Sequence, residues 1–222
     1  MSVLIEIGNA LEKGKKKLVV QYVQQALEEG FSAQDILTEG LLPGMDRVGV
    51  KFRANEIFVP EVLVAARAMN AGAALLKPLL AEEGAESLGK MVLGTVKGDL
   101  HDIGKNLVKM MVEGKGIEVI DLGVDVEPQA FVQAAIENNA GIIGCSAENN
   151  AGIIGCSALL TTTMPVMEEV VKAAEDAGIR DKVKIMVGGA PVTQDFCDSI
   201  GADYYTEDAA SAAICAAQIL SA

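Results

Sequence analysis

The sequence predicts an α/β protein in which an N-terminal helical bundle precedes a flavodoxin-like (Rossmann-like) domain with a five-stranded parallel sheet. Residues 1 to about 82 contain no convincing strand pattern, whereas from Gly89 onward short apolar runs alternate with helical patterns. The stretch 81–88 is polar and acidic and contains Gly84, which is typical of a linker. We therefore expect a helical domain with its linker over 1–88 and a sheet domain over 89–222.

Start and stop signals divide the N-terminal domain into helices. The first long apolar pattern at helical spacing ends before Gly30, a residue typical of helix C-termini. Ser32 followed by Asp35 has the spacing of a capping box and predicts the start of another helix. Pro60 suits the first turn of a last, long helix through Leu76. Together these patterns indicate a small helical bundle.

Five apolar runs predict the strands of the C-terminal domain. They are 91–96, 117–122, one of two Gly-Ile-Ile-Gly-Cys-Ser segments, 183–187 and 203–206. The helical patterns between and after them are one opened by Pro128 and others around 167–177, 194–200 and 209–220. In the flavodoxin-like order the topological switch point lies between strands 1 and 3, so a ligand is expected at the loops that leave these strands.

An identical tandem repeat precedes the third strand. Residues 137–147 read ENNAGIIGCSA, and residues 148–158 repeat the block without a change. Only the second copy leads directly into Leu159, so we expect that copy to form the strand. The first copy would then be a loop or a lengthened helix that exposes Ile142 and Ile143. Because architectural repeats are longer and degenerate, we favour a recent duplication or an artefact of the sequence record.

Composition limits the kinds of partner and compartment. The formal net charge of −13 argues against nucleic acid or an anionic membrane as a partner, and the basic run 13–17 is interpreted as a solvated helix face. The N-terminus has no signal-peptide pattern, and no apolar run approaches the ~20 residues of a membrane span. The 4 cysteines form no CxxC pair, which indicates the reduced cytoplasm and neither a disulfide framework nor a zinc site.

The single histidine of the chain, His101, lies on the loop between the first predicted strand and the following helix. Asp99, two residues earlier, can accept a hydrogen bond from one ring nitrogen and leave the other free for a metal. The alternative is a polar residue that helps to cap the next helix. Spacing alone leaves both readings open, and the position at the switch point favours the ligand.

Three further loops fall at the same end of the predicted sheet. A run rich in small hydroxyls, 157–163, follows strand 3, Gly188-Gly189 follows strand 4, and Tyr205-Thr206 lies at strand 5. Singly, these are ordinary turns and helix caps. Together they predict a long, narrow, mostly uncharged slot beside His101.

These motifs resemble a known family. Asp99-x-His101-x-x-Gly104, Ser157-x-Leu159 and Gly188-Gly189 are similar to the signature of cobalamin-binding domains of the methionine synthase and methylmalonyl-CoA mutase type. Residues 42–49 (LPGMDRVG), 56–61 (EIFVPE) and 65–69 (AARAM) resemble the helical cap of that family. A cap and a Rossmann-like domain without a further catalytic domain are similar to the corrinoid proteins of anaerobic methyltransferase systems, which demethylate methylamines, methanol, methoxylated aromatics or betaines. The resemblance covers nearly the whole chain.

The resemblance implies a cobalamin or related corrinoid bound base-off and His-on, with His101 as the lower ligand of cobalt. Asp99 would hold the other ring nitrogen, and Thr163 would complete this relay where methionine synthase has serine. The remaining cofactor contacts that the resemblance implies are Asp102, Ile103, Gly104, Ser157, Leu159, Thr161, Gly188, Gly189 and Tyr205, with Phe58 and Met69 of the cap over the upper face. Tyr204-Tyr205 departs from the family, in which a glycine usually precedes a single aromatic residue.

The implied function is a methyl carrier without catalysis of its own. A substrate-specific methyltransferase would load the methyl group on cobalt, and an acceptor methyltransferase would pass it to a thiol or tetrahydrofolate. A reductive activase is a further expected partner. The alternative is a cobalamin-dependent sensor, although such proteins normally carry an attached output module. An HD-type phosphohydrolase is rejected because it needs several histidines, and a flavin carrier or phospho-acceptor domain would explain neither the helical bundle nor the Asp99–His101 pair.

Overall fold

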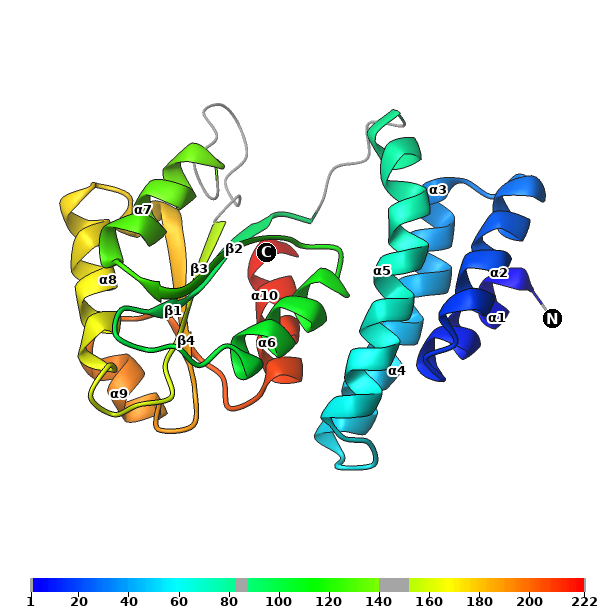
Figure 1. Ribbon diagram of the computed structural model, residues 1–222. Coiled ribbons are helices and arrows are strands. Elements are labelled where there is room, and N and C mark those ends of the chain that lie inside the picture. The colour runs from blue at the N-terminus through cyan, green and yellow to red at the C-terminus, as the bar shows by residue number, and fades with distance from the viewer. Residues whose placement is uncertain (1, 83–87, 140–151, 222) are drawn as a thin grey trace. The chain divides into compact units, whose positions relative to one another are not determined.

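The computed structural model describes residues 2–82, 88–139 and 152–221, which belong to two compact units (Figure 1). The first unit, called the cap below, comprises Met1–Ser87 together with Gly114–Gly116. The second unit, called the sheet domain, comprises Leu88–Glu113 and Ile117–Ala222.

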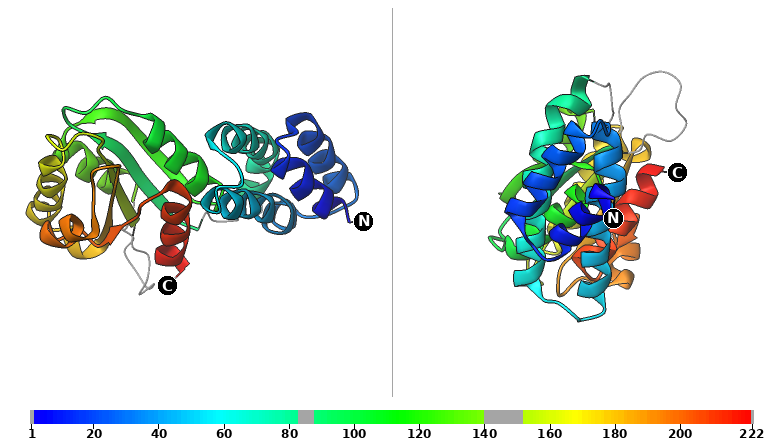
Figure 2. Two further views of the ribbon diagram at one scale, coloured as in Figure 1. Left: turned by 90° about the horizontal axis from the view of Figure 1, so that it is seen from below. Right: turned by 90° about the vertical axis from the view of Figure 1, so that its right-hand side faces the viewer.

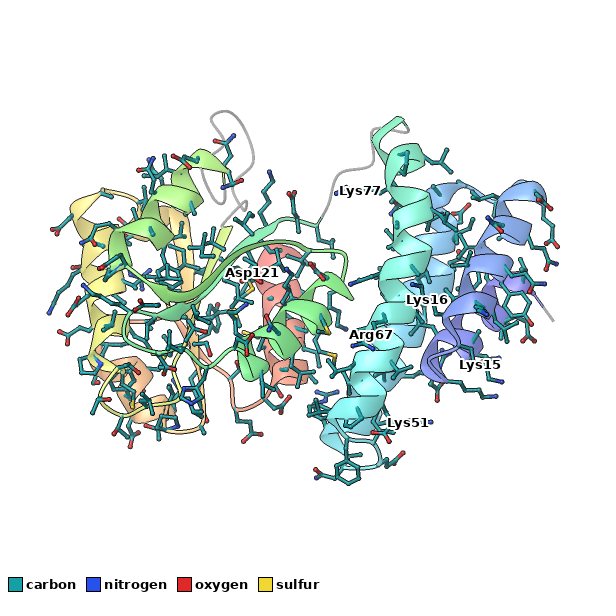
Figure 3. All side chains as sticks on the ribbon, viewed as in Figure 1. Lys15, Lys16, Lys51, Arg67, Lys77 and Asp121 are labelled. Atoms are coloured by element: carbon teal, nitrogen blue, oxygen red, sulfur yellow. The ribbon has the colours of Figure 1, made fainter. Side chains whose placement is uncertain are left out.

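The described part of the cap is helical throughout. Its elements are α1 (Val3–Glu12), α2 (Lys16–Glu28), α3 (Ala33–Asp35), the π-helical turn η1 (Ile36–Leu41), α4 (Leu42–Arg53) and α5 (Val59–Glu82). The predicted signals operate here, because Ser32 Oγ accepts a hydrogen bond from the Asp35 N–H at 3.0 Å and Gly30 has a φ of +89° just beyond α2. Lys15 and Lys16, labelled in Figure 3, are exposed on the cap, as expected for a solvated face.

One expectation about the cap needs correction. Residues Val59–Leu80 of α5 form a stretch of 22 residues that is apolar enough, by length and composition, to cross a membrane. Such a stretch is weak evidence for a membrane span, since core helices of globular proteins meet the same criteria of length and composition. Arg67 and Lys77 interrupt the stretch, and its buried positions Val62, Met69 and Leu76 follow helical spacing. The charged residues break the run of apolar letters in the sequence, so no uninterrupted apolar run marks this stretch.

The sheet domain has the predicted topology. Its strands are β1 (Lys90–Val96), β2 (Glu118–Val126), β3 (Gly152–Ser157), β4 (Val183–Gly188) and β5 (Tyr204–Tyr205). All described pairs are parallel and the order is β2-β1-β3-β4-β5, which is the flavodoxin-like order. The fold class expected from the sequence is therefore confirmed, and the switch point lies between β1 and β3.

Helices cover both faces of this sheet. They are α6 (Ile103–Glu113), α7 (Pro128–Glu137), α8 (Pro165–Asp176), the short turn η2 (Arg180–Lys182), α9 (Gln194–Ser199) and α10 (Ala209–Ser221). Figures 1 and 2 show α8 and α9 on one side of the strands and α6 with α10 on the other. A core cluster that includes Phe131, Ile154 and Met167 fills the space between the strands and the α7–α9 layer. The near-continuous apolar strands that the sequence shows are what a doubly covered parallel sheet requires.

The second copy of the tandem block forms the central strand, as expected from its link to Leu159. Ile153 and Ile154 of that copy are fully buried in β3. In the first copy, Glu137 ends α7, and Ile142 and Ile143 lie outside the described residues. The structure thus assigns the strand to the second copy.

Strand β2 differs most from the prediction, since it continues to Val126 and not only to residue 122. Its pairing with β1 shifts twice, between Leu93 and Gly94 and between Gly94 and Val96. Gly123 and Asp125 have φ values of +83° and +56°, and these left-handed residues bend the strand without ending it. Gly123 directly follows the apolar run 117–122, and a glycine at such a position usually signals a turn. At the other edge, β5 is only Tyr204–Tyr205.

Gly189 is expected to be intolerant of a side chain. It has a φ of +136°, and a Cβ placed on it would lie 1.8 Å from the carbonyl oxygen of Ala158. Gly189→Ala should therefore lower the free energy of unfolding by about 3 kcal/mol or more. Gly178→Ala is the matched control, because Gly178 has a φ of +67° but nothing within 4 Å, and should cost about 1 kcal/mol. Equal losses in chemical denaturation of the two variants would contradict the close approach.

Candidate functional site

The carboxyl ends of three adjacent strands meet at the candidate site. Thr95 of β1 pairs with Ser157 of β3, and Ser157 pairs with Gly188 of β4. The loop 97–102 leaves β1 here and carries Asp99 and His101, while the loop 158–164 leaves β3. The topology therefore brings the predicted histidine loop and the predicted hydroxyl-rich loop to the same edge of the sheet.

Asp99 joins these two loops. Its side chain has no exposed surface, and its Oδ1 accepts hydrogen bonds from the His101 backbone N–H at 3.0 Å and from the His101 ring at Nδ1, 2.7 Å away. Its Oδ2 accepts from the backbone N–H groups of Leu159 and Leu160, at 2.7 and 3.1 Å, and lies 3.0 Å from Thr163 Oγ1. The single hydroxyl hydrogen of Thr163 is shared with the Leu160 carbonyl, 2.9 Å away.

This set of donors fixes the charge of Asp99. Burial by itself raises the pKa of a carboxyl group, but the hydrogen bonds from Leu159, His101 and Leu160 outweigh it and hold the pKa of Asp99 far below its ordinary value. An ionised carboxylate can only accept, so Nδ1 of His101 carries the hydrogen of their shared bond. In the neutral ring, Nε2 then presents its lone pair, which is the form in which histidine binds a metal.

The surroundings of His101 are exposed and apolar. The side chain of His101 is 52% exposed, and on the same loop Leu100 is 72% exposed. Ile103 at the start of α6 is 75% exposed, and Leu159 and Leu160 are also exposed. Several large exposed apolar side chains near one imidazole are unusual on a protein surface and mark a binding site.

Gly104 adds an open position beside this loop. It lies in the first turn of α6, and a Cβ built on it would meet nothing within 4 Å. The glycine is therefore not required by packing within the protein. Asp102, the residue before α6, is exposed, and its Oδ2 accepts from Asn106 Nδ2 at 3.0 Å, as a residue near a helix start would.

The other predicted residues fall into two groups. Ser157 is half-buried at the end of β3, and Thr161 is exposed in the loop that follows, next to the Asp99 network. Gly188 and Gly189 approach protein backbone, because a Cβ would lie 3.2 Å from the Thr206 carbonyl oxygen at Gly188 and closer still to Ala158 at Gly189. Both glycines thus have a packing role in the sheet domain itself.

The predicted contacts Tyr205, Phe58 and Met69 lie outside the Asp99–His101 network. Tyr205 is half-buried and packs against the core cluster, whereas Tyr204 is exposed on the other face of β5. In the cap, Phe58 is 64% exposed at the start of α5, but Met69 is buried. Met69 lies on the same helical stripe as Gly72, whose surface is covered by Leu41 and Val19 of the cap.

The structure also shows side chains that sequence reasoning missed. Thr95 is fully buried and its hydroxyl donates to the His101 carbonyl oxygen at 2.9 Å. Asp125 at the end of β2 contacts the histidine loop. Lys105 of α6 is buried, and its Nζ lies 2.6 Å from Oδ1 of Asp121, which Figure 3 labels on β2. A charged residue on the apolar side of the helical pattern was the only available signal for Lys105, and nothing in the sequence linked Thr95 or Asp125 to His101.

This site can supply one imidazole ligand to a metal whose other ligands come from a cofactor. Within residues 2–82, 88–139 and 152–221, no three histidine, cysteine or acidic side chains are grouped as a protein metal cage. A corrinoid supplies its own ring of nitrogen ligands, needs one axial ligand, and can cover the exposed apolar side chains. The residues present therefore fit a corrinoid, which His101 would hold through its imidazole. The fold and the site define a corrinoid-binding protein.

Comparisons with known proteins identify the family. The B12 binding domain family matches residues 89–214, and a second B12 binding domain family matches residues 4–77. The chain is 43% identical over 218 residues to the dimethylamine corrinoid protein of Methanosarcina barkeri, covering 98% of this chain and 97% of that protein. The chain belongs to the B12-binding corrinoid proteins.

Two solved structures agree with this assignment. The crystal structure of the methanol:cobalamin methyltransferase complex MtaBC from Methanosarcina barkeri matches 99% of this chain and 80% of that chain, with a TM-score of 0.83 and 31% identity. A cobalamin-binding protein from Desulfitobacterium hafniense DCB-2 matches 97% of this chain and 98% of that chain, with a TM-score of 0.77 and 31% identity.

Gly104→Ala separates the needs of folding from those of binding. Alanine favours a helix over glycine by up to about 1 kcal/mol, so the unloaded variant should be as stable as the wild type or more so. The added methyl group occupies open space beside the histidine loop, and we expect the affinity for cobalamin to fall about tenfold. Denaturation of the unloaded protein and a cobalamin titration measure the two effects. Gln129→Ala, at the equivalent exposed position of α7, is the control, and an equal affinity loss there would contradict the assignment.

Proposed function

We propose that this chain is a corrinoid methyl carrier, which accepts a methyl group from one methyltransferase and presents it to another. The observation that carries the proposal is the Asp99–His101 pair, in which a buried, ionised carboxylate holds Nδ1 of a histidine whose side chain is 52% exposed. The cobalt of the bound corrinoid supplies the methyl-carrying chemistry. The chain itself binds, orients and shields.

His101 is proposed as the lower axial ligand in a base-off, His-on arrangement. A hydrogen bond from Nδ1 to the Asp99 carboxylate raises the basicity of the ring and prevents it from rotating away. The exposed apolar side chains of Leu100 and Ile103 would lie against the lower face of the corrin. The displaced nucleotide tail would pass the loops that follow β3 and β4, lined by Ser157, Leu159 and Thr161.

The remaining proposed contacts complete the binding surface. Phe58 of the cap is proposed to cover the upper face, and its exposure supports this role. Met69 is proposed to join it, but it is buried in the cap and would first have to be uncovered. An apolar cover excludes water from the reactive cobalt. Asp102, Ile103 and Gly104 would border the lower face next to His101.

The proposed partners are a substrate-specific methyltransferase, an acceptor methyltransferase acting on a thiol or tetrahydrofolate, and a reductive activase. Similarity to a dimethylamine corrinoid protein and to a structure of a methanol:cobalamin methyltransferase complex supports this class of partner. We also propose a cytoplasmic location, which the free cysteines Cys156, Cys197 and Cys215 support.

Anaerobic reconstitution tests the proposal. The purified chain is loaded with hydroxocobalamin, and a base-off absorption spectrum at one cobalamin per chain is expected. The loaded protein is reduced to Co(I) with titanium(III) citrate. It is then incubated with labelled dimethylamine, trimethylamine or methanol, the methyltransferase encoded beside its gene, and a thiol with an acceptor methyltransferase. Transfer of label to the protein and onward to a thiol supports the carrier. If the protein binds cobalamin but no combination of substrate and methyltransferase transfers label to it, the result would favour the cobalamin-dependent sensor. If it binds no corrinoid, both the methyl carrier and the sensor would be refuted.

A further inference from the structure

The histidine loop has a second set of restraints besides Asp99. Residues 97–102 connect β1 to α6 without a helix or strand. The hydrogen bonds local to this segment come from Asp99, whose N–H donates to Val96 and whose carboxylate accepts from His101. A ligand on an unrestrained loop would lose binding free energy to the entropy of ordering. The structure shows two anchors outside the loop, Asp125 and Thr95.

Strand β2 is shaped to deliver the first anchor. Gly94 pairs with Gly123 and Val96 pairs with Val126, so the single residue Thr95 of β1 lies opposite two residues of β2. This is a β-bulge, and such bulges redirect side chains next to functional sites. Asp125 is one of these two residues of β2, and it adopts a left-handed conformation with a φ of +56°.

The bulge places Asp125 against both sides of the peptide that leads into Asp99. Oδ1 of Asp125 accepts from the Gly98 backbone N–H at 2.7 Å. The Asp125 backbone N–H donates to the Asp99 carbonyl oxygen at 3.0 Å. A left-handed conformation is costly for most residues, but aspartate and asparagine tolerate it better than other residues that have a side chain. Aspartate can therefore adopt this conformation and also supply the accepting oxygen.

Thr95 restrains the loop on the other side of Asp99. Its buried hydroxyl donates to the His101 carbonyl oxygen at 2.9 Å, whereas Asp125 bonds the backbone of Gly98 and Asp99. The backbone on both sides of the Asp99 side chain is thus hydrogen-bonded to the ends of β1 and β2. The Asp99 carboxylate itself is bonded to the loop that follows β3.

We propose that Asp125 is a positioning residue for the cobalt ligand, and that with Thr95 it holds the loop 97–102 so that His101 is prearranged to ligate. This inference rests on the proposed function and adds a residue that is neither among the proposed corrinoid contacts nor part of the Asp99 relay. Its removal should increase the fraction of protein in which His101 is detached from cobalt, by about fivefold, which is the effect of one lost hydrogen bond.

Three variants test the proposal. Asp125→Gly keeps the left-handed backbone and removes the accepting oxygen, whereas Asp125→Asn retains an oxygen that can accept from Gly98. Thr95→Val removes the second anchor with little change in volume. Asn139→Gly, an equivalent change at an exposed left-handed residue at the end of α7, is the matched control.

The first measurement uses the unloaded protein. Amide exchange of Gly98 should accelerate about fivefold or more in Asp125→Gly but not in Asp125→Asn or Asn139→Gly. In the same variant, the ¹⁵N chemical shifts of the two ring nitrogens of His101, measured by NMR, should move toward each other, because the ring would exchange between tautomers and orientations. Unchanged ring shifts alongside faster Gly98 exchange would overturn the proposal, because the anchor would then not reach the histidine.

The second measurement uses protein loaded with cobalamin and reduced to Co(II). The nitrogen splitting in the EPR spectrum reports the fraction with His101 on cobalt. Asp125→Gly and Thr95→Val should lower the His-on to His-off ratio about fivefold, and Asp125→Asn should restore it. An unchanged ratio in Asp125→Gly, or an equal loss in Asp125→Asn and Asn139→Gly, would overturn the proposal. If the wild type binds no corrinoid, the proposed function fails, and the NMR measurement still decides whether Asp125 positions the ring.

Discussion

Replacing His101 with alanine is expected to remove nitrogen ligation of cobalt while leaving the protein folded. His101 is the one histidine in the sequence, and the side chain of another residue cannot supply imidazole. Loss of partners that merely orient a metal ligand typically costs 10–100-fold in affinity or activity, so loss of the ligand should lower the rate of methyl transfer by about 100-fold or more. The absorption spectrum of the loaded variant should lose its His-on character.

The fold should tolerate this change because the backbone contacts of residue 101 do not depend on its side chain. The N–H still donates to Asp99 and the carbonyl still accepts from Thr95, so the cost in stability should be about 1 kcal/mol or less. Imidazole added to the alanine variant should partly restore the wild-type spectrum. A variant with the wild-type spectrum before any imidazole is added would show that another group ligates the cobalt.

The second large effect is expected at Asp99, whose replacement by asparagine should lower the free energy of unfolding by about 3 kcal/mol. The carboxylate has no exposed surface and accepts from backbone N–H groups on two loops. The amide of asparagine has one accepting oxygen, and its NH₂ group would face backbone N–H donors. Some of these buried N–H groups would therefore lose their acceptor. Chemical denaturation of both proteins at neutral pH measures the difference.

The stability advantage of aspartate should also depend on pH. The pKa of Asp99 lies far below its ordinary value in the folded protein, so folding favours the ionised form. The advantage is therefore fully present above about pH 4, the range of an unfolded aspartate, and is lost as pH falls through the lower pKa of the folded state. Asp102→Asn is the control, because this exposed carboxylate accepts from Asn106 and should show little change. A difference between wild type and Asp99→Asn that is constant down to pH 2 would contradict this account.

The sequence was most informative where a local pattern has one structural meaning. The alternation of strands and helices predicted the sheet order, and the link from the second tandem copy to Leu159 predicted which copy becomes β3. The hydrogen bond between Asp99 and His101 agrees with the expectation that Asp99 can accept from one ring nitrogen, since residues two apart on one loop can bring their side chains together. The pairing of Asp99 with the loop after β3 was expected at Thr163 by resemblance, whereas the backbone donors Leu159 and Leu160 were not anticipated.

Contacts that depend on non-local geometry were not predictable. The two register shifts of β2 arise from left-handed residues, and only the folded sheet shows that they turn Asp125 toward the histidine loop. The burial of Lys105 depends likewise on Asp121, a residue on another element. The packing roles of Gly188 and Gly189 required the positions of Thr206 and Ala158, which the sequence does not give.

The most direct test of the central claim uses the fact that the chain has one histidine. Protein grown with ¹⁵N-labelled histidine, loaded with cobalamin and reduced to Co(II), carries the label in a single ring. If His101 ligates the cobalt, each EPR line that unlabelled histidine splits into a triplet becomes a doublet with the labelled protein. A triplet that persists in the labelled protein would assign the ligand to the cofactor's own base, and a spectrum without nitrogen splitting would show that no imidazole is bound. Either result would contradict the assignment of His101 as the ligand.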